Sequence, residues 1–173
     1  MTFQQAASLS HAPWAIWPWL RLPASLTAAL RRAYGGEKRF PRAVLIACGR
    51  SRPYENERKQ LGIRRGEWVF WREVFLHGPD PCRPAIQGRT LFPLRAISRG
   101  LRPLTKHGNR PIGNTLFRHR RLRRSPIRIR TLPAAGSGRE WQRSSILVQG
   151  RTRIFIQERF LADLPSWRGR GHP

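Results

Sequence analysis

The stretch WQRSSILVQGRTRIFIQERF, residues 141–160, decides the fold of this chain. Apolar and polar residues alternate through its second half, and a period of two is typical of a half-buried β-strand. Gln149 and Gly150 lie midway and suit a tight turn between two strands. The stretch therefore predicts an antiparallel β-hairpin.

Four stretches upstream also have strand-like character, because they hold apolar, aromatic and β-branched residues between turn residues. They are RAVLIACG (42–49), EWVFWREVFL (67–76), AIQGRTLFP (85–93) and RIRTL (128–132). Around residue 129, isoleucines alternate with arginines, which predicts a half-buried strand with a cationic solvent face. We expect residues 52–67 to be a polar connection and the arginine-rich residues 118–124 to be a basic one.

Two short helices are expected beside these strands. Apolar residues recur at helical spacing after Leu22, Ser25 is a suitable N-cap and Gly35 a suitable end, so a helix is predicted near 26–34. A second short helix is predicted to begin at Pro111, a residue suited to the first helical position. The predicted fold class is α+β, an antiparallel sheet of about six strands with short helices on one side.

The length of 173 residues suits one domain with its own core. We place that domain at residues 20–165, between an N-terminal segment at 1–19 and a flexible tail at 166–173. Residues 133–138, PAAGSG, are expected to be a loop within the domain.

The N-terminal segment holds an apolar run with Trp14, Trp17 and Trp19. No basic residue precedes the run and a proline interrupts it, so it predicts neither a signal peptide nor a membrane span. We expect its tryptophans to cap the core. Cys48 and Cys82 have no partners at metal-ligand spacing and the five histidines are scattered, so we expect no metal and a reducing cytoplasm.

The charge of the chain raises the alternative of nucleic-acid binding. Lys and Arg number 34 against nine acids, a formal net charge of +25. A basic surface gives salt-dependent affinity for nucleic acid, and Trp68, Trp71 and Phe75 are candidates for stacking on bases. These aromatics lie on a strand long enough to be core, however, and no nucleic-acid-binding motif accompanies them. We therefore expect no specific nucleic-acid partner.

Two charges are expected on the apolar face of a strand. Arg72 alternates with Phe70 and Val74, and Glu158 lies between Ile156 and Phe160 on the same face of the last strand. A lone buried ion costs several kcal/mol, so each of these charges needs a partner. Either they pair with each other inside the core, or they face a pocket in which a ligand supplies the opposite charge.

The starts of the two helices add an independent indication of a ligand site. The first amides of a helix have no partner within the helix, so the N–H groups of Leu26 and Ile112 are candidate anion donors. The guanidinium of Arg72 suits a carboxylate, to which it donates two hydrogen bonds. Together these groups predict a site for a small carboxylate whose other end is mostly apolar, with Glu158 near a hydroxyl group.

The chain resembles the chorismate pyruvate-lyases of bacterial ubiquinone biosynthesis at these same places. The resembling pieces occur in the order of that family and span most of residues 20–165. They are SLT (25–27), WREVFL (71–76), GRTLFP (88–93), GNRPIGNTLF (108–117), WQRSS (141–145) and IQERFL (156–161).

The resemblance implies conversion of chorismate to 4-hydroxybenzoate and pyruvate without a cofactor or a metal, on an antiparallel sheet with flap-like loops. It implies that Arg72 and the amides of Leu26 and Ile112 hold the ring carboxylate, and that Glu158 meets the ring hydroxyl. Arg72 and Glu158 are thus the expected catalytic residues. Arg143 is the candidate contact for the enolpyruvyl carboxylate, and the protein is expected to be a cytoplasmic monomer.

The sequence departs from the family pattern at several positions, and these departures affect the outer part of the expected pocket. His107 stands where an apolar residue is usual, Ser144 stands where a second arginine is common, and residues 133–140 are rearranged. Another alternative remains, a non-catalytic sensor of aromatic acids, because this fold also serves as the effector-binding module of bacterial regulators. The short segment before the first helix means that such a sensor needs a separate DNA-binding chain.

Overall fold

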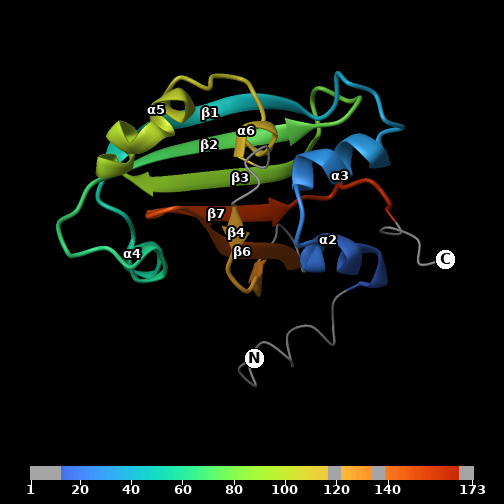
Figure 1. Ribbon diagram of the computed structural model, residues 1–173. Coiled ribbons are helices and arrows are strands. Elements are labelled where there is room, and N and C mark those ends of the chain that lie inside the picture. The colour runs from blue at the N-terminus through green and yellow to red at the C-terminus, as the bar shows by residue number, and fades with distance from the viewer. Residues whose placement is uncertain (1–12, 117–121, 134–138, 168–173) are drawn as a thin grey trace.

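The computed structural model describes residues 13–116, 122–133 and 139–167. It has one sheet of seven strands in which all pairs are antiparallel, with the order β1-β2-β3-β7-β6-β4 and β5 also paired to β6 (Figure 1). The strands are β1 Arg42–Ser51, β2 Val69–His77, β3 Pro84–Pro93, β4 Arg123–Arg124, β5 Arg128–Pro133, β6 Arg139–Gln149 and β7 Thr152–Phe160. The α+β prediction is confirmed.

Strand β4 is the strand that the sequence did not predict. Arg123 and Arg124 were expected within a basic connection, and instead they pair with Val148 and Leu147 of β6. A strand of two residues is too short to show an alternation of apolar and polar residues, so only the neighbouring strand reveals the pairing. Residues 118–121 of that connection lie outside the described residues, as do 134–138 of the expected loop and 168–173 of the expected tail.

The hairpin of β6 and β7 is confirmed, but its turn lies one residue later than the predicted Gln149 and Gly150. Its register runs from Trp141 opposite Phe160 to Gln149 opposite Thr152, so the turn consists of Gly150 and Arg151. Gly150 has a φ of 58°, in the left-handed region that glycine adopts at little cost. This hairpin forms the centre of the sheet with β3 beside β7.

Most helices lie on one face of the sheet, the face toward the viewer in Figure 1. We call it the inner face, and its core contains the buried residues Leu26, Leu30, Val74, Leu76 and Phe160. The helical segments on this side are α2 Trp17–Arg21, α3 Leu26–Ala33, α5 Arg102–Thr105 and α6 Gly113–Leu116, with the short turns η1 Trp14–Ile16, η2 Leu94–Ala96 and η3 Ile97–Leu101.

Helix α3 forms where its sequence predicts. The Ser25 hydroxyl accepts a hydrogen bond from the Ala28 amide at 3.3 Å, which makes Ser25 the N-cap, and Gly35 follows the end of the helix with a φ of 77°. Helix α6 begins at Gly113 rather than at Pro111, so the prediction was early by two residues.

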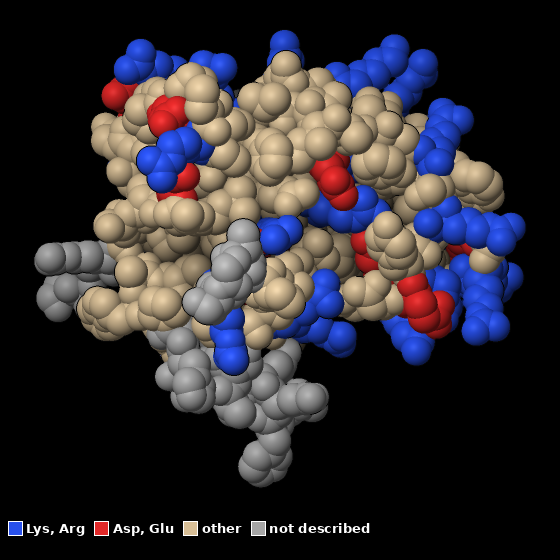
Figure 2. Space-filling view, turned by 180° about the vertical axis from the view of Figure 1, so that it is seen from behind, with Lys and Arg blue, Asp and Glu red and all other residues tan. Residues whose placement is uncertain are grey.

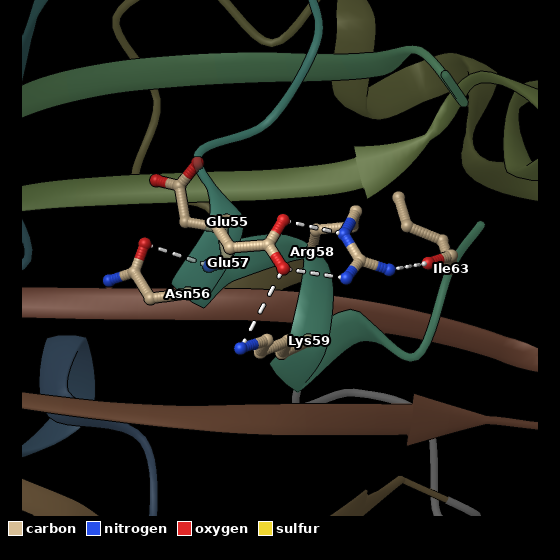
Figure 3. A network of polar contacts seen from close by, with 6 residues as sticks. All are labelled: Glu55, Asn56, Glu57, Arg58, Lys59 and Ile63. Atoms are coloured by element: carbon tan, nitrogen blue, oxygen red, sulfur yellow. Dashed lines mark hydrogen bonds and ion pairs between the residues drawn. The ribbon is translucent and has the colours of Figure 1, made fainter. Parts of the chain in front are cut away.

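Helix α4, Glu55–Leu61, contradicts the prediction of a polar connection. Figure 3 shows how polar contacts hold it: Arg58 donates to Glu55 at 2.7 Å, and Lys59 lies 3.7 Å from the same carboxylate. The Glu57 carboxylate accepts from the Tyr54 amide at 2.9 Å and so caps the first turn.

Helix α4 covers the opposite, outer face of the sheet. Its Leu61 is fully buried in a cluster with Leu91, Ile146 and Phe155. Glu57 is 2% exposed and pairs with Arg89 of β3 at 2.8 Å. One buried leucine, a buried ion pair and hydrogen bonds from Ser144 and Arg153 to Gln60 anchor this helix, so it does not need the apolar stripe by which helices are recognised.

The tryptophans of the N-terminal segment differ in their environments. Trp19 is fully buried in the inner core and donates to the Pro165 carbonyl, as expected of a core residue, whereas Trp14 is 88% exposed, contrary to the prediction. Trp68 precedes β2 and is 51% exposed, so the expectation that it is a core residue of that strand is wrong. None of the described helices is long and apolar enough to cross a membrane.

Candidate active site

Two rows of side chains cross the inner face of the sheet at its centre. One row runs from Val74 through Gly88 and Glu158 to Arg143. The next row runs from Arg72 through Thr90 and Ile156 to Ser145. Arg72 and Glu158 therefore lie in neighbouring rows on strands β2 and β7, with strand β3 between them.

Arg72 is held by backbone carbonyls and not by Glu158, so the hypothesis that these two charges pair is wrong. Its side chain is 3% exposed, and its Nη2 donates to the carbonyls of Gly108 at 2.6 Å and Arg110 at 2.9 Å. Burial lowers the pKa of the Arg72 guanidinium. Its buried Nε has no hydrogen-bond partner among the described residues, so one donor of a buried cation stays available for a ligand.

Glu158 has Arg143 as its partner. The Arg143 Nε donates to the Glu158 carboxylate at 2.5 Å, and Arg143 is 1% exposed. The Nη1 of Arg143 donates to the carbonyls of Trp19 at 2.6 Å and Leu22 at 2.9 Å, which ties the pair to the end of α2. The pair therefore fixes the direction of the Glu158 carboxylate from the protein side.

A small cavity of about 50 Å³ lies between α3, the sheet and the segment before α6. Its walls are mainly apolar, with Glu158 as the charged side chain. The lining residues are Leu26, Thr27, Val74, Leu76, Ile86, Gly88, Thr90, Pro111, Ile112, Gly113, Ile156, Gln157 and Glu158. Leu26, Ile112 and Glu158, which the sequence singled out, thus border one cavity. Arg72 is not among the lining residues; it lies two residues before Val74 on β2 and opposite Thr90 of β3.

Two glycines shape this cavity. Gly88 lies at its floor, where a Cβ would fit in ordinary van der Waals contact with Val74 Cγ2 at 3.5 Å and would add a side chain to the floor. A Cβ at Gly113 would lie 2.7 Å from the Thr27 hydroxyl, a distance that real contacts do not reach. Gly113 therefore lets residues 107–113, which we call the flap, approach the start of α3. This approach brings the backbone of Ile112 and Leu26 to the same cavity.

The partner of Glu158 was present in the sequence but was not recognised. Once the turn at Gly150 and Arg151 is fixed, counting outward along the two strands places Arg143 directly opposite Glu158. Side chains opposite each other on one face lie within contact distance. The register of the hairpin was thus the signal that paired Glu158 with Arg143 rather than with Arg72.

Within the described part of the chain, no three His, Cys, Asp or Glu residues come together in a way that would hold a metal ion. Arginines and backbone groups surround the carboxylate at the cavity instead. Such a set of donors suits an organic acid with a hydroxyl group.

The chain is similar to known proteins over most of its length. The family model described as chorismate lyase matches residues 1–168. A probable chorismate pyruvate-lyase of Chromohalobacter salexigens is 38% identical over 160 residues, covering 87% of this chain and 82% of the relative. A chorismate pyruvate-lyase of Pectobacterium atrosepticum is 33% identical over 111 residues, covering 64% of this chain and 58% of the relative.

Solved structures share the fold at low identity. The C-terminal domain of the histidine utilization repressor from Pseudomonas syringae gives a TM-score of 0.57 at 10% identity, over 76% of this chain and 99% of that one. The ligand-binding domain of a putative GntR-family regulator from Bordetella bronchiseptica gives 0.54 at 18%, over 76% and 89%. Such identities show the fold alone. The sequence matches favour a lyase over a nucleic-acid-binding protein, and the chain belongs to the chorismate lyase family.

Proposed function

We propose that the protein converts chorismate to 4-hydroxybenzoate and pyruvate in the cavity beneath the flap. The observation that carries the proposal is the arrangement of two fixed charges about an apolar cavity. The Glu158 carboxylate lines the cavity, and Arg72, which is not among the lining residues, keeps a buried, unused Nε donor next to the lining residues Val74 and Thr90. Membership of the chorismate lyase family supports the same reaction.

The ring of chorismate fits over Gly88 in this proposal, because the missing side chain leaves a flat apolar floor. Arg72 binds the ring carboxylate, aided by the backbone amides of Leu26 and Ile112 where the flap meets α3. Glu158 accepts a hydrogen bond from the ring hydroxyl, and Arg143 holds its carboxylate in place.

Little covalent chemistry is required of the protein. The bond between the ring and the enolpyruvyl oxygen breaks, the neighbouring ring carbon loses its hydrogen, and the ring becomes aromatic, which makes the reaction downhill. Orientation of the substrate and stabilisation of developing charge then supply the catalysis. Glu158 lies at the hydroxyl-bearing end of the ring, where the hydrogen is lost.

The flap must move for the substrate to enter. A cavity of about 50 Å³ has room for a few water molecules and not for chorismate. The hydrogen bonds from Arg72 to the Gly108 and Arg110 carbonyls hold the flap closed. A ligand carboxylate at Arg72 therefore acts on the same guanidinium that anchors the flap.

The test follows chorismate consumption and 4-hydroxybenzoate formation in the wild type, Arg72→Met and Glu158→Gln. We expect each substitution to lower kcat/KM by about 100- to 1,000-fold, the usual effect of losing one charged contact in an active site. Arg50→Met, which removes an exposed arginine of β1, is the matched control and should behave as the wild type. A wild type inert toward chorismate, or full turnover in both variants, would refute the proposal.

We also propose that the protein works as a cytoplasmic monomer that releases 4-hydroxybenzoate. The exposed, unpaired thiols of Cys48 and Cys82 support a reducing compartment.

A further inference from the structure

The tip of the flap is a tight turn at the edge of the sheet. The Arg110 amide donates to the His107 carbonyl at 3.2 Å, and Gly108 has a φ of 53°, which glycine adopts at little cost. Among the described strands β1 pairs only with β2, so the N–H groups on its other side need another acceptor or water. In Figure 1 the chain between α5 and α6 passes along this edge before α6 lies over the inner face. The tip of the flap is thus close to unpaired backbone groups of β1.

Asn109 connects this turn to β1. Its side-chain Oδ1 accepts a hydrogen bond from the Leu45 amide at 2.9 Å. The register of β1 with β2 shifts directly after this residue, between Leu45 and Ala47. The Asn109 oxygen therefore satisfies an edge amide at the point where the strand pairing becomes irregular. We call this hydrogen bond the latch.

The latch is the second anchor of the flap tip. Arg72 donates to the carbonyls of the residues on either side of Asn109, so the three consecutive residues 108–110 are all tied to the sheet. The Arg72 anchor uses the guanidinium to which we assign the ring carboxylate. Neither Asn109 nor Leu45 lines the cavity, so the latch shares no group with a ligand there. The latch can therefore hold the flap in the same way whether or not a ligand is bound.

Asn109 also lines a basic groove of about 330 Å³ beside the flap. Arg31, Lys38 and Arg42 line the same groove, and Pro111 lines both the groove and the cavity. Lys38 and Arg42 have no ion-pair partner within the described part of the chain. The surroundings of Asn109 therefore favour a negatively charged acceptor at this position even more than a neutral one.

We propose that Asn109 is a positioning residue that controls the opening of the flap. This inference rests on the function proposed above, because the flap carries the Ile112 amide that we assign to the ring carboxylate. A contact that the closed flap makes both with and without a ligand stabilises the two states equally, and it is lost in the open state through which ligands pass. The latch therefore slows entry and release by the same factor and leaves the affinity unchanged. Asn109 thereby sets the rate at which 4-hydroxybenzoate leaves.

The rates of ligand binding test this proposal. Stopped-flow fluorescence measures kon and koff for 4-hydroxybenzoate in the wild type, Asn109→Leu and Asn109→Asp. Asn109→Leu removes the acceptor at similar side-chain size. We expect it to raise both rates by about 3- to 10-fold, the value of one neutral hydrogen bond, and to leave Kd within about twofold. Asn109→Asp keeps the acceptor oxygen and makes it a charged one beside Lys38 and Arg42, so neither rate should exceed that of the wild type.

Lys106→Leu is the matched control. It places the same leucine at an exposed position one residue before the flap, and it should change neither rate. Wild-type rates in Asn109→Leu would overturn the proposal. A weaker Kd with an unchanged kon would overturn it too, because that result is typical of a residue that contacts the ligand. Equal rates in Asn109→Asp and Asn109→Leu, both faster than the wild type, would show that the acceptor oxygen is not what holds the flap.

Amide hydrogen exchange tests the latch without a ligand. The Leu45 amide donates to Asn109, so its exchange should be about 3- to 10-fold faster in Asn109→Leu than in the wild type. Asn109→Asp should keep the protection of this amide, and Lys106→Leu should not change it. An exchange rate of Leu45 that is the same in Asn109→Leu and the wild type would defeat the latch.

The two proposals fail in different ways. A wild type that neither consumes chorismate nor binds 4-hydroxybenzoate defeats the proposed function, while the exchange of the Leu45 amide still tests the latch. Normal wild-type turnover together with unchanged ligand rates in Asn109→Leu defeats the role of Asn109 alone.

Discussion

Glu158 depends on Arg143 for its position. The carboxylate lies at the edge of an apolar cavity, and the buried guanidinium opposite it on β6 holds it at 2.5 Å. Arg143 in turn donates to two carbonyls at the end of α2, so the N-terminal helix and the central hairpin share this contact. The same side chain thus links the active site to the stability of the fold.

Removal of Arg143 is expected to destabilise the protein strongly. Arg143→Met leaves the Glu158 carboxylate and two carbonyls without their donor, and breaking a buried pair from one side costs about 3–5 kcal/mol. Urea unfolding of the variant and the wild type measures this loss. The double variant Arg143→Met/Glu158→Met should recover most of it, because neither charge then remains, yet stay inactive toward chorismate. An Arg143→Met protein as stable as the wild type would contradict this account.

At the scale of the elements, the flap contains one titratable histidine. His107 begins it and lies 3.4 Å from the Pro111 carbonyl. Burial lowers the pKa of His107, the contact with that carbonyl opposes this, and the charges of Arg72 and Arg110 lower it further. The closed flap therefore favours the neutral imidazole.

A pH dependence of flap closure follows. The pKa of His107 is lower in the closed flap than its ordinary value of about 6.5. The contribution of neutral His107 to the stability of the closed flap is therefore fully present above that pH. The contribution is lost as the pH falls toward the lower pKa, where the charged ring repels Arg72 and Arg110. We expect kcat/KM for chorismate to fall below about pH 6.5. His107→Leu should flatten this part of the profile while matching the wild type above neutral pH; an unchanged profile would exclude His107 as the cause.

The elements also show where prediction from sequence succeeds. Strands β2, β6 and β7 follow from alternation, and β3 follows from its apolar and β-branched residues between turn residues. Helix α4 was missed because caps, ion pairs and one buried leucine hold it instead of an apolar stripe. Strand β4 was missed because a two-residue strand exists only through its neighbour.

At the scale of the whole molecule, the net charge of +25 acts on a substrate that is a dianion. On the outer face, basic side chains are spread in separate groups with acidic ones beside several of them (Figure 2). Such a surface attracts anions in general and raises the rate at which they arrive.

We expect kcat/KM for chorismate to fall as sodium chloride is raised through about 0.1 M, where the Debye length is about 10 Å, while kcat changes little. The affinity for 4-hydroxybenzoate should fall less steeply, because it carries one charge instead of two. A kcat/KM independent of salt would show that the net charge does not guide the substrate. Light scattering of the same samples tests whether the protein is a monomer.

Sequence patterns alone predict six of the seven strands, helix α3, and Arg72 and Glu158 as charges on an apolar face. They do so because strand patterning and capping are local properties, which a few neighbouring residues settle. The tertiary structure alone decided which charges meet. The pairing of Arg143 with Glu158, the carbonyls that hold Arg72, and Arg124 beside Ser145 depend on strand register and on the docking of the flap and α2. Those contacts join residues far apart in the chain, so no local pattern contains them.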